Sequence, residues 1–288
     1  MSGNPFSDDV ATATHADRRL REGQLKILAL GHYQARLTYV NAHDHLSSMG
    51  RLLGSDGAMS LYAHTTLSRS VAEAAVRHAW LLDRSVSYEQ RMTRYAAVTY
   101  YGAENKLKGA NQSLVRVPQQ VRDSLINKAS AELDQVRALI DQAGMDLGLD
   151  RRGRDVARIK LRGSDVATPI KFETGQLMEE LLGESPGWYL LSSGVSHSGP
   201  WVLHSAVVGD RTGPELSLTP DLLEVAGASQ TAISASELIL ERHANYFGFA
   251  PEPYTRKSRQ RRSMLDTLMR EQVVRQAANP APLIRAEH

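Results

Sequence analysis

Apolar residues recur every three or four positions along most of this 288-residue chain, whereas the two-residue alternation typical of half-buried strands is almost absent. The helical spacing is clearest over residues 117–144, where the apolar positions are Ile126, Ala129, Leu133, Val136, Ile140 and Ala143. It is also strict over residues 219–247, which open with Thr219-Pro220-Asp221, a favourable helix start. We therefore predict an all-α fold, an antiparallel helical bundle with one long irregular insertion and a basic C-terminal helix.

The same spacing defines the expected elements and domains. Helices are predicted at residues 17–30, 32–53, 60–83, 88–107, 117–144, 174–182, 188–198, 219–247 and 256–277. Residues 147–172 lack periodicity and are predicted to form the irregular insertion, with at most a short extended piece at 157–161. We expect a disordered N-terminus at 1–15, a bundle domain at 16–248, and a basic C-terminal helix and tail at 249–288.

Composition and motifs exclude several classes of protein. The chain has no Cys, which rules out disulfide frameworks and thiolate sites. It has no run of about 18 apolar residues and no apolar signal core within residues 1–20, so we expect a cytoplasmic protein without a membrane span. It has no Gly-rich phosphate loop, and the adjacent residues His43, Asp44 and His45 of a helix point too far apart to share an ion. We therefore expect no cofactor and no metal.

The predicted helix at 60–83 carries a charged stripe opposite a broad apolar face. Arg69, Glu73 and Arg77 are spaced four residues apart, so their side chains form a ladder along one side, flanked by Tyr62 and Trp80. On a solvated helix the ladder is a pair of weak ion pairs. In a cleft, two guanidinium groups held by a carboxylate would form a clamp for phosphate or carboxylate groups.

The predicted helix at 188–198 places Tyr189, Ser193 and His197 on one face, at intervals of four residues. One interpretation is structural, with small residues allowing close helix packing and His197 buried and hydrogen-bonded. The other is catalytic, with His197 as a general acid/base, because the unperturbed imidazole pKa lies near neutrality.

Two segments concentrate positive charge, although the net charge of the chain is only +2. They lie at residues 151–162 and 256–262 and could bind phosphate backbones or remain simply solvated. The candidate nucleic-acid-binding residues are Arg151, Arg152, Arg256, Lys257, Arg259, Arg261 and Arg262.

Two stretches within residues 60–205 resemble helical proteins of unassigned function from high-GC, actinobacterial-type bacteria. They are the Arg69–Glu73 helix that ends in Trp80-Leu81-Leu82-Asp83, and the Ser193–His197 helix. The arrangement is also similar to HEPN bundles, many of which are metal-independent RNases that pair across a dimer and carry an Arg-x(4–6)-His motif. The helix with His197 has no Arg, so this resemblance requires Arg69 or Arg77 to supply the cation.

Three hypotheses about function follow. The first is a HEPN-like, homodimeric protein that binds or cleaves RNA, with a catalytic set of His197, Arg69, Arg77, Glu73 and Ser193. In it His197 is the acid/base, the arginines stabilise phosphate charge and Glu73 orients them. The second is a non-enzymatic scaffold whose C-terminal helix docks a protein partner through Leu265, Leu268, Met269 and Val273. The third is a small-molecule enzyme with its site between helices 60–83 and 188–198.

Overall fold

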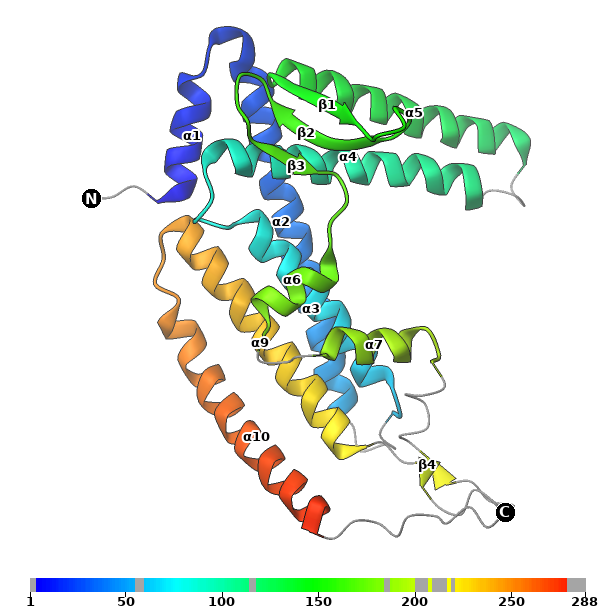
Figure 1. The fold of residues 1–288 in the computed structure, drawn as a ribbon, viewed down its shortest axis with the longest axis vertical. Helices are drawn as coiled ribbons and strands as arrows, with labels where there is room; N and C mark the ends of the chain where they lie inside the picture. The colour runs from blue at the N-terminus through cyan, green and yellow to red at the C-terminus, as the bar shows by residue number, and fades with distance from the viewer. Residues whose placement is uncertain are drawn as a thin grey trace. The chain divides into compact units, whose positions relative to one another are not determined.

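The computed structural model describes residues 4–54, 60–113, 118–183, 187–199, 207–208, 217–218 and 221–278. The elements follow one another as α1 (Pro5–His15), α2 (Arg18–Leu53), α3 (Ala63–Leu81), α4 (Tyr88–Ser113), α5 (Gln119–Gln142), β1 (Met145–Leu149), β2 (Val156–Leu161), β3 (Ala167–Pro169), α6 (Thr174–Leu181), α7 (Trp188–Ser196), β4 (Val207–Val208), β5 (Ser217–Leu218), α9 (Leu222–Phe247) and α10 (Glu252–Ala278) (Figure 1). Most of the described residues are helical, which confirms the predicted fold class in its coarse form. The predicted helix start at Thr219-Pro220 and the tail at 279–288 lie outside the described residues.

The chain divides into two compact units that interleave along the sequence. Unit 1 comprises Met1–Thr38, His78–Glu173 and Arg242–Phe249, and unit 2 comprises Tyr39–Arg77, Thr174–Glu241 and Ala250–His288. Helices α2, α3 and α9 contribute residues to both units. This division differs from the expected bundle at 16–248 with a separate C-terminal helix, because α10 belongs to the same unit as most of α9.

A small antiparallel sheet in unit 1 occupies most of the segment that the sequence predicts to be irregular. Its strand order is β1-β2-β3, with Met145 opposite Leu161 and Lys160 opposite Ala167. Strands β2 and β3 contact α4, and β1 contacts α5, so the sheet covers this antiparallel helix pair (Figure 1). Each strand has one fully buried side chain, from Met145, Ile159 and Thr168 respectively. One buried position per strand produces no readable alternation, which explains the difference from the prediction.

Helices α1 and α2 differ from the sequence-based expectations for residues 1–53. Residues Pro5–His15, expected to be disordered, form α1, because Asn4 caps the helix by accepting the Ser7 N–H at 2.9 Å. Helix α2 runs unbroken through Gly31, where the sequence predicts a break. A Cβ atom at Gly31 would lie 2.1 Å from the Tyr95 ring, so the glycine is needed for the close approach of α4 rather than for a turn.

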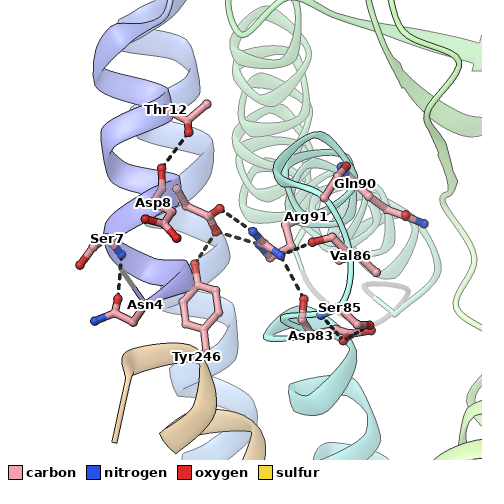
Figure 2. A network of polar contacts seen from close by, with 12 residues as sticks. Asn4, Ser7, Asp8, Thr12, Asp83, Ser85, Val86, Gln90, Arg91 and Tyr246 are labelled. Carbon is pink, nitrogen blue, oxygen red and sulfur yellow. Dashed lines mark hydrogen bonds and ion pairs between the residues drawn. The ribbon is translucent and has the colours of Figure 1, made fainter. Parts of the chain in front are cut away.

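A buried ion pair joins three remote segments of unit 1. The Arg91 guanidinium donates to both Asp9 carboxylate oxygens, from Nε at 2.8 Å and from Nη2 at 2.6 Å. The Tyr246 hydroxyl donates to the same carboxylate at 2.8 Å and accepts from His32 Nε2 at 2.9 Å. Figure 2 shows Arg91 and Tyr246 converging on α1, with a further Arg91 bond to the Asp83 carbonyl at 3.2 Å. The network therefore ties α1, α4 and the end of α9 to one point.

Histidine 78 is buried in the same unit as a neutral ring. Its Nδ1 donates to the Ala35 carbonyl at 2.9 Å, and its ring stacks on that of His243 with centroids 5.6 Å apart. Burial lowers the pKa of His78 to about 4 and also lowers the pKa of His243. Protonation of His78 therefore opposes folding.

Acidification should destabilise the protein through His78. The pKa of His78 is about 4 in the folded chain against 6.5 for an unperturbed histidine. Its neutral ring therefore contributes fully to stability above pH 6.5, and this contribution is lost as the pH falls towards 4. The resulting loss in the free energy of unfolding is about 3 kcal/mol, measured by urea unfolding at several pH values. His78→Asn keeps a hydrogen-bond donor near the position of Nδ1 but cannot be protonated. On acidification its free energy of unfolding should therefore fall less than that of the wild type. His43→Asn, at an exposed position, should behave as wild type, and equal losses in wild type and His78→Asn would contradict the account.

Candidate functional site

Within unit 2 the charged stripe of α3 meets α7 at Arg69. The Arg69 Cζ atom lies 5.0 Å from the centroid of the Tyr189 ring, and Arg69 Nε donates to Glu73 Oε1 at 2.7 Å. The Arg69 side chain is only 16% exposed and that of Glu73 is 37% exposed. This end of the stripe therefore faces α7 and only partly water.

Two glycines make room for the aromatic pair that begins α7. A Cβ atom at Gly227 of α9 would lie 3.2 Å from the Trp188 ring, and one at Gly175 of α6 would lie 3.0 Å from the Tyr189 ring. The absence of these Cβ atoms lets the start of α7 pack closely between α6 and α9. The position of Tyr189 over Arg69 thus depends on glycines that are remote from it in sequence.

The other predicted catalytic residues are less closely grouped. Ser193 is half-buried one turn beyond Tyr189, and His197 is exposed immediately after the last residue of α7. The interpretation of His197 as a buried histidine is therefore wrong. Among the described residues, no hydrogen bond or ion pair joins His197 to Arg69 or Glu73. Arg77 is half-buried two turns beyond Arg69 on the same helix.

The two aromatic residues that the sequence places beside the stripe have different surroundings. Tyr62 is half-buried in unit 2. Trp80 belongs to unit 1, where its ring lies 4.9 Å from the Arg94 guanidinium and packs edge-on against Phe172. Trp80 therefore stacks on a structural arginine of unit 1.

The predicted phosphate-binding residues of α10 are divided between a paired and an unpaired set. Arg262 Nε donates to Glu237 Oε2 at 3.1 Å, and Arg259 pairs with Glu241, so both arginines are neutralised by α9. Burial raises the pKa of the Glu237 carboxyl. Arg256, Lys257 and Arg261 are exposed. Only these three of the five predicted phosphate-binding residues on α10 present unpaired charge among the described residues.

The arginines of the β1–β2 hairpin are exposed. Arg151 and Arg152, both predicted to bind phosphate, lie with Arg154 in the turn, and Arg158 lies on β2. The Asp150 carboxylate accepts the backbone N–H groups of Arg154 at 2.9 Å and Arg152 at 3.1 Å, and these bonds lower its pKa. Beside the turn lies an open hollow of about 740 Å³ lined by Leu149, Asp150, Arg151, Ala157, Arg158, Ala167 and Pro169.

The predicted docking face of α10 is partly used within unit 2. A groove of about 280 Å³ between α9 and α10 is lined by Leu222, Leu223, Ala226, Leu265, Leu268, Met269, Glu271, Gln272 and Arg275. Leu268 and Val273 remain 61% and 51% exposed. Part of this face therefore contacts α9, and part stays accessible.

Comparisons with known proteins find no matching family model, curated protein or solved structure. Among the described helices none is long and apolar enough to cross a membrane. In the same part of the chain, no three His, Asp or Glu side chains lie together as a metal site would require.

The sequence patterns considered above do not single out the polar residues on the buried side of α3. His64, Thr65 and Ser68 are all fully buried there, and Trp188 is buried at the start of α7. A signal was present, because polar residues one turn apart on an otherwise apolar face are unusual for a helix that only packs against its neighbours.

Proposed function

We propose that the chain binds RNA through the phosphate backbone, with the β1–β2 hairpin as the main contact. The observation that supports this proposal most is the state of Arg151, Arg152, Arg154 and Arg158. All four are exposed, and no ion pair joins any of them to a carboxylate among the described residues. Unpaired guanidinium groups can bind phosphate oxygens and so release the cations condensed on the nucleic acid.

The contrast with neighbouring basic residues strengthens this choice of surface. Arg162, at the end of β2, pairs with Asp141 and, at 2.7 Å, with Asp146. Arg259 and Arg262 of α10 pair with glutamates in the same way. A paired arginine adds little net potential, so a polyanion gains less from approaching it.

The similarity of the helical arrangement to HEPN bundles supports RNA rather than another polyanion. The same proposal includes a homodimer and a cytoplasmic location. The alternative of a non-enzymatic scaffold is supported by the exposed apolar residues Leu268 and Val273 of α10, which a protein partner could cover.

Replacing the two arginines that line the hollow should weaken RNA binding and its dependence on salt. We expect Arg151→Ala/Arg158→Ala to reduce affinity for a single-stranded RNA about tenfold at low salt and the slope of log K against log salt by about 1.4. Fluorescence anisotropy across a KCl series measures both quantities. Arg259→Ala/Arg262→Ala removes the same charge from paired positions. This variant should leave the affinity and the salt slope nearly unchanged. Absence of binding by the wild-type chain at low salt, or equal losses in the two variants, would contradict the proposal.

RNA cleavage is a second candidate function, favoured by the contact between Arg69 and Tyr189. Tyr189 begins the face of α7 that continues through Ser193 towards His197, and Glu73 holds Arg69 against this face. In this proposal Arg69 and Arg77 stabilise charge on the phosphate, and the exposed imidazole of His197 transfers the proton.

His197→Ala should abolish any cleavage without unfolding the chain. The rate is expected to fall by at least about 100-fold, because the general acid/base is removed. The melting temperature should not change, since His197 is exposed. A gel assay with labelled RNA and a thermal melt give the two readouts, with His43→Ala as the matched exposed control. Unchanged cleavage in His197→Ala, or loss of its fold, would rule out this role.

A further inference from the structure

A cluster of polar atoms in unit 2 is buried without protein partners. His64 Nε2, Thr65 Oγ1, Ser68 Oγ, Arg69 Nη1 and Trp188 Nε1 are each buried and meet no hydrogen-bond partner among the described residues. Four of the five atoms belong to adjacent turns of α3. His64 and Ser68 are one turn apart, as are Thr65 and Arg69, so these side chains share one face of the helix.

Helices α7 and α9 border this face of α3. Arg69 lies against the Tyr189 ring, and Trp188 is the preceding residue of α7. Trp188 in turn packs on Gly227 of α9, and the charge of Asp221, just before α9, acts on His64. Figure 1 shows α7 beside the first half of α3. The four α3 side chains share one helix face, and Arg69 and Trp188 lie in the part of unit 2 where α3, α7 and α9 come close together.

Such a group is unusual for a protein that binds nothing there. Nearly all buried polar groups in folded proteins are hydrogen-bonded, and each unpaired one opposes folding. A buried guanidinium N–H without an acceptor is the most unfavourable member of the set. The cluster thus calls for hydrogen-bond partners from outside the chain, either ordered water or a bound ligand, and its donors and acceptors define which ligand would fit.

The donor and acceptor inventory defines the ligand. Arg69 Nη1 and Trp188 Nε1 can only donate, so the ligand must offer acceptor oxygens. His64 Nδ1 lies 3.3 Å from the Ser60 carbonyl, which can only accept, so Nδ1 carries the proton and Nε2 of the neutral ring is an acceptor. Burial lowers the pKa of His64, which favours that neutral ring. The ligand must therefore also carry an O–H group, while the Thr65 and Ser68 hydroxyls can serve either role.

We propose that this cluster binds a phosphate group, as the free ion or as a small monoester. Hydrogen phosphate has oxygens to accept from Arg69 and Trp188 and an O–H to donate to His64. Sulfate has the same shape and charge but no O–H at neutral pH. The proposal does not rest on RNA binding by the hairpin, whose arginines belong to unit 1, and it shares Arg69 alone with the proposed cleavage site in unit 2.

The test is a calorimetric titration of the full-length chain, in phosphate-free buffer at constant ionic strength, with inorganic phosphate, sulfate and glycerol phosphate. We expect saturable binding of phosphate and about tenfold weaker binding of sulfate, because sulfate leaves His64 Nε2 without a donor. Binding of glycerol phosphate as well would identify the natural ligand as a monoester, and its exclusion would identify the free ion. No phosphate binding would overturn the proposal, and equal sulfate binding would overturn the role of His64.

The variant Thr65→Val/Ser68→Ala separates a ligand site from a structural cluster. Removing two unpaired buried hydroxyls should raise the melting temperature without phosphate, while phosphate affinity falls about tenfold or more. Ser236→Ala is the matched control, since the Ser236 hydroxyl already donates to the Ala232 carbonyl at 2.8 Å. It should bind phosphate as wild type does. Unchanged phosphate affinity in Thr65→Val/Ser68→Ala would overturn the proposal.

Discussion

A guanidinium group can be buried only if negative charge and hydrogen-bond acceptors surround it, and unit 1 depends on how Arg91 meets this requirement. Asp9 binds it through both carboxylate oxygens, although the two residues are 82 positions apart in sequence. Tyr246 adds a third segment, and His32 a fourth contact through the Tyr246 hydroxyl. Loss of either charged partner would leave the other buried and uncompensated, which costs about 3–5 kcal/mol in comparable pairs.

Arg69 in unit 2 meets the same requirement only in part. Glu73 satisfies its Nε and the Tyr189 ring covers one face, but Nη1 is buried without an acceptor in the described part of the chain. The two arginines therefore suggest different roles. Arg91 holds a fold together with a carboxylate of the chain itself, whereas Arg69 has the surroundings of a group that completes its contacts with an external anion.

Local patterns in the sequence predict the features that local geometry controls. The apolar spacing locates the helices, and the four-residue interval predicts the Arg69–Glu73 pair, because both depend on residues within two turns. Of the sheet, the sequence predicts only the extended piece at 157–161, which coincides with β2, and it misses β1 and β3 because each strand buries only one side chain. The passage of α2 through Gly31 depends on Tyr95, and the burial of Arg69 depends on Tyr189, both remote in sequence. The sequence also treats all arginines of the two basic segments alike, and only the structure separates Arg259, paired with Glu241, from the exposed Arg151.

The most direct test of the different roles of Arg69 and Arg91 is an anomalous difference map from crystals grown with arsenate, the heavier analogue of phosphate that also carries an O–H. We predict an arsenic peak placed so that an arsenate oxygen lies within hydrogen-bond reach of Arg69 Nη1, beside Thr65 and Ser68, and no peak beside Arg91, which Asp9 already satisfies. A map without a peak at Arg69, or one in which a carboxylate of the chain binds Nη1, would contradict this account.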